Sequence, residues 1–313
     1  MIDTKLLRKE TKLIAENLYK RGFIFETKKW NQLETKRKEL QKFNEEQQSK
    51  LNEISKDIGI KKNNSVDSSD LQKQAKDLTT KIKDQTKELE KLLNEIDEFI
   101  LSLPNLIDKD VPVGKDETDN LELRKVGNPR EFSFSPMDHL EIGGNRIDME
   151  LGAKITGSRF KVLKQDIALL QRALISFMID THVHEHGYEE VYVPYIVNRE
   201  SLVGTGQLPK FEEDLFKIEN EKGFYLTSTA EVPVTNLIRD QIIESKNLPL
   251  KYVCHTPCFR SEAGSYGKDT KGIMRLHQFE KVELVQAVEA SDSEEALEEL
   301  TSCLLYTSPS PRD

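Results

Sequence analysis

Cysteine, glycine and proline are scarce in this chain, and long apolar runs are missing. Its 313 residues contain 3 Cys, 15 Gly and 11 Pro. Three cysteines cannot build a disulfide framework in a chain of this length, and so little glycine and proline excludes a collagen-like protein. No apolar run approaches the ~20 residues that cross a bilayer, and residues 1–10 lack the apolar segment of a signal peptide. We therefore expect a soluble cytoplasmic protein with no membrane partner.

The length predicts about two domains, and the charge is unevenly divided along the chain. The formal net charge is −9. Residues 1–100 hold 22 basic and 19 acidic groups, whereas residues 101–313 hold 24 and 36. A polyanionic partner would therefore meet the N-terminal part more easily. The small positive excess, spread over a hundred residues, does not amount to a basic patch.

Apolar residues recur at alternating steps of three and four along two stretches, which begin at Trp30 and at Leu71. This spacing is the heptad pattern of a coiled coil. Gly59 interrupts the first stretch, turn-forming residues fill 63–70, and Pro104 closes the second stretch. Two such stretches predict a long antiparallel hairpin, which forms an N-terminal helical arm over residues 1–104. The pattern fits a dimerisation coiled coil or a spacer as well as a probe for a large partner.

A second domain is predicted after a linker. Residues 105–145 are rich in Pro, Gly, Asp and Asn and lack sustained periodicity, which is typical of a linker region. Apolar residues at helical spacing then predict a helix within 158–186. Strand-like stretches follow at 190–196, 224–228, 250–260 and 273–287. The last two are joined by a Gly-rich loop and predict an antiparallel hairpin, so an α+β fold with an antiparallel sheet fits better than a doubly wound parallel sheet.

The last predicted strand places unlike side chains on one face. Because side chains alternate along a strand, Phe279, Lys281 and Glu283 point to the same side, between His277 and Val285. An aromatic ring, a cation and a carboxylate in a row are not the pattern of a buried core face. At ~3.3 Å per residue, Phe279 and Glu283 are roughly 13 Å apart, about the span between a nucleotide base and a group beyond its α-phosphate. A solvent-facing strand explains the same strip equally well.

Two groups of residues have metal-ligand chemistry without a complete ligand set. His182, His184 and His186 lie near the end of the predicted helix, but neither a fourth ligand nor a His-Glu-x-x-His order accompanies them. Cys254 and Cys258 are separated by three residues and have no partner pair. We interpret the histidines as a helix end and predict no metal site.

Four runs resemble seryl-tRNA synthetases of the bacterial type. They are VGTGQLPKF at 203–211, YLTSTAEVPVTN at 225–236, YVCHTPCFRSEAGS at 252–265 and HQFEKVELV at 277–285. The resemblance covers essentially residues 1–301 and includes the hairpin. It implies a class II synthetase antiparallel sheet with flanking helices, incomplete in this chain, preceded by a coiled-coil arm that binds tRNA. The partial catalytic domain then spans 146–301.

The resemblance implies a serine site. Thr229, Ala230 and Glu231 match the Thr-x-Glu loop of the family, which holds serine, and Glu231 takes the substrate ammonium group. Glu283 accepts a hydrogen bond from the serine hydroxyl. Alanine lacks this hydroxyl and would leave the buried acceptor unpaired, so such a site disfavours the binding of alanine.

The resemblance also implies an ATP site. Arg260, Ser261 and Glu262 match the second class-defining motif, in which the arginine grips the ATP α-phosphate and the glutamate contacts the adenine side. Arg260 is therefore the expected catalytic residue, since a guanidinium fork can hold phosphate oxygens as charge builds at phosphorus. Phe279 matches the position that stacks on adenine. ATP and Mg²⁺ are the implied cofactors, and the family's metal ligands lie beyond the end of this chain.

The implied activity is the ATP-dependent ligation of L-serine to tRNA(Ser) through seryl-adenylate. Lys268, Lys271 and Arg275, in and after the Gly-rich loop 264–272, would contact the tRNA acceptor end, although an ordinary hairpin tip explains the same residues. A selenocysteine tRNA is a further partner that the resemblance allows. Pro194 matches the first class motif, which lies at a homodimer interface in the family.

The sequence departs from the family near its end. A Glu-Ile-x-Ser segment and a third motif, whose arginine contacts the ATP γ-phosphate, do not occur. Residues 302–313 no longer resemble the family, and a helix from Asp292 should run through Leu300. We expect a fragment with a foreign tail that is inactive alone. Two alternatives stay open: a non-catalytic synthetase-like protein that binds tRNA, and a relative that loads amino acids onto carrier proteins.

Overall fold

The computed structural model describes residues 2–128, 131–219, 221–263 and 271–307, which form two compact units, 1–123 and 124–313. The division falls within the predicted linker. In the described part of the chain, no helix combines the length and the apolar character that a membrane crossing requires.

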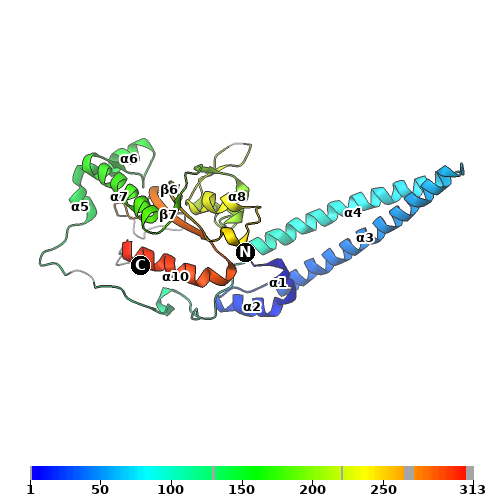
Figure 1. Ribbon diagram of the computed structural model, residues 1–313, viewed down its shortest axis with the longest axis horizontal. Helices are drawn as coiled ribbons and strands as arrows, with labels where there is room; N and C mark the ends of the chain where they lie inside the picture. Colours follow the sequence, from blue (N-terminus) through cyan, green and yellow to red (C-terminus); the bar gives the residue numbers. More distant parts are fainter. Residues whose placement is uncertain (1, 129–130, 220, 264–270, 308–313) are drawn as a thin grey trace. The chain divides into compact units, whose positions relative to one another are not determined.

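Unit 1 is a helical hairpin with a small helical base. Its helices are α1 (Thr4–Lys9), α2 (Thr11–Lys20), α3 (Thr27–Asn63) and α4 (Ser69–Ser102), followed by the 3-10 turn η1 (Glu117–Asp119). Helices α3 and α4 run side by side (Figure 1), and Lys36 of α3 pairs with Glu88 of α4 at 3.0 Å. The expected interruption at Gly59 is wrong: α3 continues to Asn63, because a single glycine only weakens a helix.

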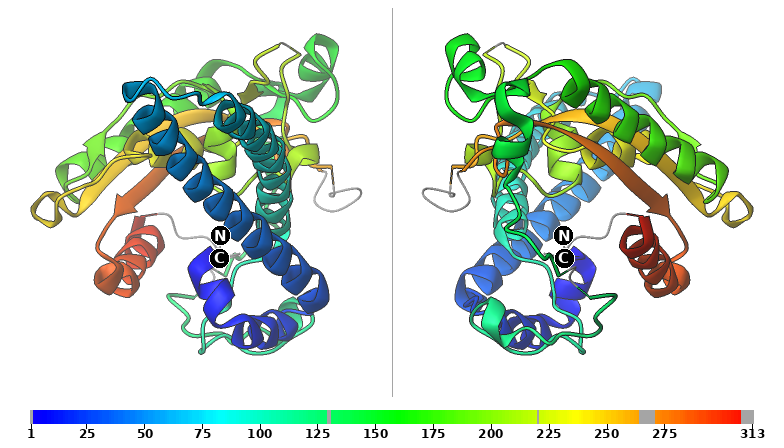
Figure 2. Two further views of the ribbon diagram at one scale, coloured as in Figure 1. Left: turned by 90° about the vertical axis from the view of Figure 1, so that its right-hand side faces the viewer. Right: turned by 90° about the vertical axis from the view of Figure 1, so that its left-hand side faces the viewer.

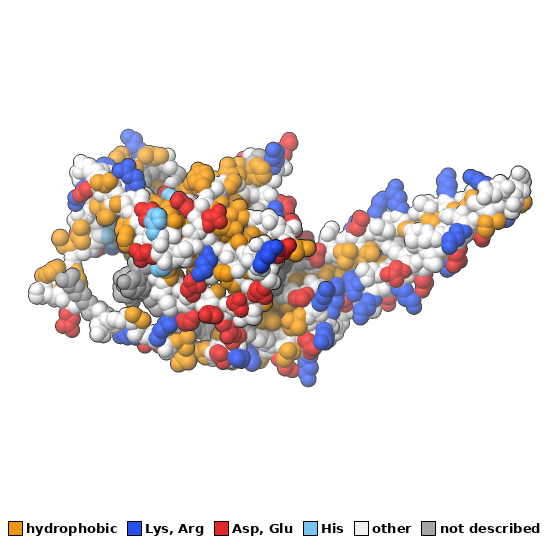
Figure 3. All heavy atoms as spheres, viewed as in Figure 1, with side chains coloured by type: hydrophobic (Ala, Val, Ile, Leu, Met, Phe, Trp, Pro, Cys, Tyr) orange, Lys and Arg blue, Asp and Glu red, His pale blue; other side chains and the backbone are white. Residues whose placement is uncertain are grey.

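The core of unit 1 lies at the base of the hairpin. The ring of Trp30 stacks on that of Phe99 with centroids 6.0 Å apart, and Leu7 of α1 and Leu18 of α2 are buried in the same cluster. Further out, Lys/Arg and Asp/Glu side chains interleave along the hairpin (Figure 3). The hairpin is therefore anchored by its base, which the heptad pattern alone does not indicate.

Unit 2 is an α+β unit built on one three-stranded sheet. The strands β3 (Glu189–Glu190), β6 (Leu250–Phe259) and β7 (Gln278–Ala287) lie in the order β3-β6-β7. Strand β3 is parallel to β6, and β6 and β7 form a ten-residue antiparallel ladder in which Cys254 faces Glu283. This arrangement confirms the predicted antiparallel hairpin. Helix α7 (Gln165–His184) packs against β6 and β7 (Figure 2).

Short elements complete unit 2. Two small antiparallel pairs join β1 (Ile147–Asp148) with β2 (Val162–Leu163), and β4 (Ile196–Val197) with β5 (Tyr225–Leu226). The remaining helices are α5 (His139–Gly143), α6 (Met149–Ile155), α8 (Arg199–Gly204), α9 (Glu231–Thr235) and α10 (Ser293–Thr307). The 3-10 turns are η2 (Gly144–Arg146), η3 (Glu212–Asp214), η4 (Asn236–Ile238), η5 (Ser245–Asn247) and η6 (Ala290–Asp292).

Several predicted boundaries are wrong. The helix expected within 158–186 begins at Gln165, because residues 162–163 pair with β1 and Arg159 has a left-handed backbone. The stretch 190–196 divides between β3 and β4, which pair with different strands on either side of Val193 and Pro194. The strand expected from residue 273 begins at Gln278. The helix expected from Asp292 through Leu300 is confirmed as α10, Ser293–Thr307.

Candidate functional site

The loop between β5 and α9 brings the predicted serine residues to the sheet. Residues 227–230 are buried, and Thr227 exchanges backbone hydrogen bonds with both neighbours, donating to the Tyr195 carbonyl and accepting from the Phe259 amide. Ala230, 0% exposed, packs in a cluster with Val193, Val234 and Cys254. Ala230 therefore anchors the loop in the core, whereas Glu231 is the first residue of α9 and is exposed.

Thr229 links this loop to β7. Its hydroxyl donates to Oε2 of Glu283 at 2.8 Å and accepts a hydrogen bond from the Glu231 amide at 3.2 Å. Lys281, two residues along the same face of β7, forms an ion pair with the same carboxylate oxygen of Glu283. Both contacts use Oε2, so among the described residues the other oxygen, Oε1, stays available to a ligand.

Arg260 follows β6, and its side chain contacts Ser228 of the loop and Phe279 of β7. Its Nε donates to the Ser228 carbonyl at 3.2 Å, and its guanidinium carbon lies 5.3 Å from the centre of the Phe279 ring. The guanidinium thus covers the ring that the resemblance assigns to adenine. Stacking of adenine on Phe279 stays a prediction, and it requires the opposite face of the ring or a movement of Arg260.

Glu262, two residues after Arg260, forms an ion pair with Arg275. Glu262 has a φ of 52°, a left-handed conformation that is uncommon outside glycine and is often found at functional sites. Nη1 of Arg275 donates to Glu262 Oε2 at 3.0 Å. The Nε of Arg275 is buried and has no hydrogen-bond acceptor within the described ranges. A buried donor without a partner is costly, which makes this N–H a candidate contact for a bound anion.

Ser261 supports the site from outside. Its amide donates to the Asp214 carbonyl at 2.9 Å, and its hydroxyl bonds to the Glu213 carbonyl. The Ala263 amide donates to the Asp214 carboxylate at 3.0 Å. These bonds attach the chain after β6 to η3, so Ser261 holds the segment in place rather than facing the cavity.

A cavity of about 450 Å³ opens over these residues, a size typical of small-molecule sites. Its lining contains six of the charged side chains named above and several residues without a predicted role. The lining residues are Gln207, Phe211, Asp214, Leu215, Ser228, Thr229, Glu231, Arg260, Glu262, Arg275 and Lys281. Ala230, Ser261, Phe279 and Glu283 stand behind or beside this lining.

Sequence reasoning assigned no role to six of the lining residues. Ser228 lies in the family-like run at 225–236, and Leu215 lies in none of the four runs. Gln207 and Phe211 belong to the family-like run at 203–211, which supplied a signal but no role. Lys281 was placed on the correct face of its strand without a function. Asp214 had no signal, because it reaches the site only through its bonds to Ser261 and Ala263.

The two cysteines beside the site are buried. Burial, the largest cause, raises the pKa of Cys254 to about 11, and nearby carboxylates add to the shift. Burial also raises the pKa of Cys258. A raised pKa favours the protonated thiol, which is a weak nucleophile. Cys254 packs against the loop between β5 and α9, in the cluster that contains Ala230.

The residues assigned to the tRNA acceptor end separate in the structure. Lys268 lies outside the described residues. Lys271 pairs with Asp138 at 2.5 Å, and a Cβ at the neighbouring Gly272 would lie 2.1 Å from His139 Nε2, so the base of the loop packs tightly on α5. Arg275 instead lines the cavity. The acceptor-end contact of all three stays a prediction.

Comparison with known proteins identifies relatives of both parts of the chain. Residues 1–107 match the seryl-tRNA synthetase N-terminal domain, and residues 211–304 match the tRNA synthetase class II core domain (G, H, P, S and T). A serine–tRNA ligase from Legionella pneumophila (strain Lens) is 52% identical over 303 residues, which cover 96% of this chain and 71% of the relative.

Two solved structures are also similar. The seryl-tRNA synthetase from Pyrococcus horikoshii complexed with ATP has a TM-score of 0.83 and 34% identity, over 96% of this chain and 73% of that chain. The cytoplasmic serine–tRNA ligase from Naegleria fowleri in complex with AMP has a TM-score of 0.79 and 26% identity, over 96% and 74%.

Proposed function

The chain belongs to the seryl-tRNA synthetase family, and on that basis we propose that its cavity binds L-serine and ATP and serves the formation of seryl-adenylate. The observation that carries this proposal is the contact between Thr229 and Glu283, which joins the two predicted serine-binding segments from different parts of the chain. Because these residues are separated by more than fifty positions, a chance similarity in one motif does not account for their meeting.

The residues that line the cavity suit a nucleoside triphosphate. Three cations, Arg260, Arg275 and Lys281, line one cavity, and the buried Nε–H of Arg275 needs an acceptor that phosphate oxygens can supply. We propose Mg²⁺ as the companion of ATP. When bound, Mg²⁺ neutralises phosphate charge, and we assign no residue of this chain to it.

The proposed first step needs positioning more than a protein nucleophile. The serine carboxylate oxygen attacks the α-phosphorus of ATP, its new bond replaces the bond to pyrophosphate, and Arg260 stabilises the charge that builds on the phosphate oxygens. Glu231 holds the serine ammonium group at the mouth of the cavity. Glu283 accepts from the serine hydroxyl through Oε1, while Thr229 and Lys281 hold Oε2.

In the proposed second step, a hydroxyl of the terminal adenosine of tRNA(Ser) attacks the seryl carbonyl carbon and releases AMP. The helical arm would carry the tRNA body, and Lys268, Lys271 and Arg275 the acceptor end. A selenocysteine tRNA is proposed as an additional substrate, and the cytoplasm as the location. We expect the 313-residue chain alone to complete neither step, since the Glu-Ile-x-Ser segment and the third motif do not occur in it. We expect no serine-dependent ATP–pyrophosphate exchange, and measurable exchange would contradict this expectation.

We also propose a homodimer. Leu170, Leu174 and Phe177 lie along one side of α7 and are exposed, with Phe177 60% accessible. Tyr192, 84% exposed, and Pro194 follow in the segment that matches the first class motif. Exposed apolar side chains gathered in this way are typical of an interface, and a second copy of this chain is the proposed occupant.

Binding of a non-reactive seryl-adenylate analogue tests the site without requiring turnover. The variant Glu283→Gln should bind this analogue about 10–100-fold more weakly, the cost of a hydrogen bond to a charged acceptor. Glu280→Gln is the matched control, because Glu280 lies on the opposite face of β7 and contacts His255. Equal affinity of Glu283→Gln and the unchanged chain would refute the proposed serine site.

A further inference from the structure

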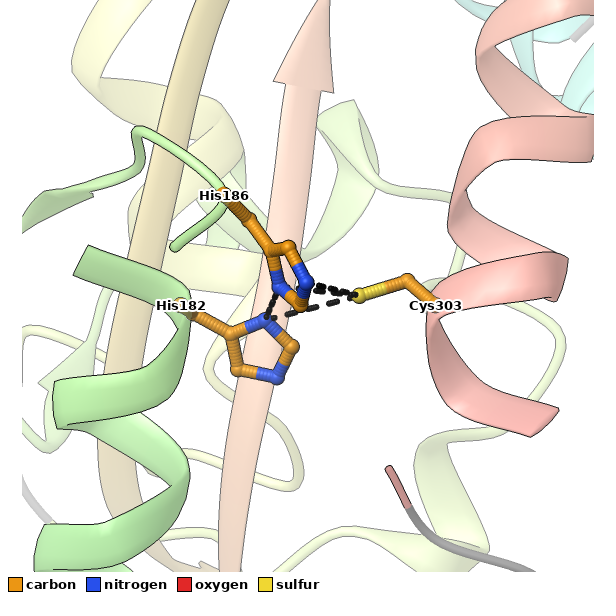
Figure 4. Close-up of side chains that lie close together, drawn as sticks. All are labelled: His182, His186 and Cys303. Carbon is orange, nitrogen blue, oxygen red and sulfur yellow. Dashed lines mark hydrogen bonds between the residues drawn. The ribbon is translucent and has the colours of Figure 1, made fainter. Parts of the chain in front are cut away.

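Three potential metal-ligating side chains meet between the ends of α7 and α10 (Figure 4). His182 lies in the last turn of α7, His186 follows two residues after that helix ends, and Cys303 lies towards the end of α10. One ligand atom from each residue lies within 4.8 Å of the others. The histidines are neighbours in sequence, whereas the thiol comes from more than a hundred residues further along the chain.

The distances between the ligand atoms match those around a tetrahedral ion. Nδ1 of His182 and Nδ1 of His186 are 3.0 Å apart, and Sγ of Cys303 lies 3.6 Å from the first and 3.2 Å from the second. With bonds of about 2.0–2.1 Å to nitrogen and 2.3 Å to sulfur, a tetrahedral zinc ion separates two nitrogens by about 3.4 Å and nitrogen from sulfur by about 3.6 Å. Each observed distance is within about 0.4 Å of this geometry.

We propose that His182, His186 and Cys303 form a zinc-binding site. Two imidazoles and one thiolate are ligands that favour zinc over the hard cations Mg²⁺ and Ca²⁺, which prefer oxygen. Three protein ligands leave a fourth position for water or another ligand, as in open zinc sites. His182 is 4% exposed, and its ring lies edge-on to that of Tyr188 with centroids 5.8 Å apart, so its orientation is fixed by packing.

Neighbouring contacts hold the two helices in position for the ion. Glu299, one turn before Cys303 on α10, pairs with Lys251 of β6 at 2.6 Å and accepts from Gln286 of β7 at 3.3 Å. Gln286 also donates to the Tyr188 hydroxyl at 2.7 Å. Because Gln286 and Glu283 are an odd number of residues apart, the metal-binding group lies beside the face of the sheet opposite to the cavity.

This site is independent of the proposed function. The histidines alone lack a further ligand, which is why the sequence predicts no metal there, and Cys303 supplies that ligand. Cys303 lies within residues 211–304, which match the class II core domain. A bound ion would join α10 to α7.

Cobalt substitution tests the site in the full chain. Metal-free protein is titrated with Co²⁺, and Zn²⁺ is then added. We expect one Co²⁺ per chain, with the visible bands of a tetrahedral ion and a near-ultraviolet thiolate-to-cobalt charge-transfer band, all lost when Zn²⁺ displaces the cobalt. Failure of the unchanged chain to give the charge-transfer band would overturn the proposal, as would binding of copper ions but not zinc.

Variants assign the ligands. Cys303→Ser should abolish the charge-transfer band and weaken zinc binding about 100-fold in competition with a chromophoric chelator, and His186→Gln should weaken it similarly. His184→Gln is the matched control, because His184 is exposed and lies outside the cluster. Circular dichroism checks that each variant is folded. A charge-transfer band that persists in Cys303→Ser, or zinc binding that falls equally in His184→Gln, would contradict the assignment.

Discussion

At the scale of single residues, arginine partners stabilise the buried carboxylate of Glu34 in unit 1. Glu34 of α3 is 7% exposed, and Arg8 and Arg37 both donate to its carboxylate at 3.0 Å or less. Burial acts to raise the pKa of Glu34, but the hydrogen bonds from Arg37 and Arg8 outweigh it and leave the pKa lowered. This cluster attaches α1 to α3 at the base of the arm.

Replacing Glu34 by glutamine should destabilise unit 1 by about 1.5–3 kcal/mol at neutral pH, because two arginines lose their charged acceptor. A lowered carboxyl pKa stabilises the fold above the unfolded value and loses that effect as the pH falls through the folded value. The difference between the variant and the unchanged chain should therefore shrink as the pH is lowered from neutral to below 4.5, the ordinary carboxyl value. Urea unfolding followed by the fluorescence of Trp30, the single tryptophan, measures it.

The exposed Glu39 on the same helix provides the control for this prediction. Glu39→Gln should change the unfolding free energy by less than about 0.5 kcal/mol. A cost for Glu34→Gln that is the same at both pH values, or that equals the cost for Glu39→Gln, would contradict the role of the buried carboxylate.

At the same scale, the sequence could predict which residues share a face but not which of them touch. Strand alternation correctly placed Phe279, Lys281 and Glu283 together. It could not indicate that Arg260 covers the Phe279 ring or that Lys281 pairs with Glu283. Those contacts depend on the rotamers of long side chains and on the loop after β6, and neither follows from a period of two.

Helices and strands differ in how far their own sequence specifies them. The hairpin of α3 and α4 was predictable, because heptad spacing extends along both helices. The base formed by α1 and α2 was not, since helices of 6 and 10 residues carry too few turns for a clear period. Likewise β3 and β4 are 2 residues long and are defined by their partners rather than by their own composition.

The hairpin allows a clean test of tRNA binding at the scale of elements. Replacing residues 44–80 by a short glycine-rich turn removes the outer part of α3 and α4 while keeping the base core around Trp30 and Phe99. The shortened chain should keep its thermal stability within a few degrees and lose at least about tenfold in affinity for tRNA(Ser), with weaker salt dependence. Filter binding at two salt concentrations measures this.

An unchanged tRNA affinity in the shortened chain would contradict the proposed role of the arm. Absence of tRNA binding by the unchanged chain would favour the alternative in which a relative of the synthetases loads amino acids onto carrier proteins. If the affinity falls, the fluorescence of Trp30 shows whether the base of the shortened chain is still folded.

At the scale of the whole molecule, the proposed homodimer rests on the exposed side of α7. Phe177→Glu should convert a dimer into a monomer in analytical ultracentrifugation, since a charge at the centre of an apolar interface is not compensated. Ser176→Glu is the control, because at about 100° per residue it points away from the row of Leu170, Leu174 and Phe177. A monomer in the unchanged chain, or a dimer that survives Phe177→Glu, would contradict the interface.

The central claim is that this chain recognises serine in activated form, and calorimetry on the unchanged 313-residue chain tests it most directly. Non-reactive seryl- and alanyl-adenylate analogues differ by one hydroxyl, the group assigned to Glu283. We predict that the seryl analogue binds about 10–100-fold more tightly, because the alanyl analogue leaves a charged acceptor unpaired. Equal affinities would contradict serine as the substrate, and failure to bind either analogue would contradict the adenylate site and favour a protein that only binds tRNA.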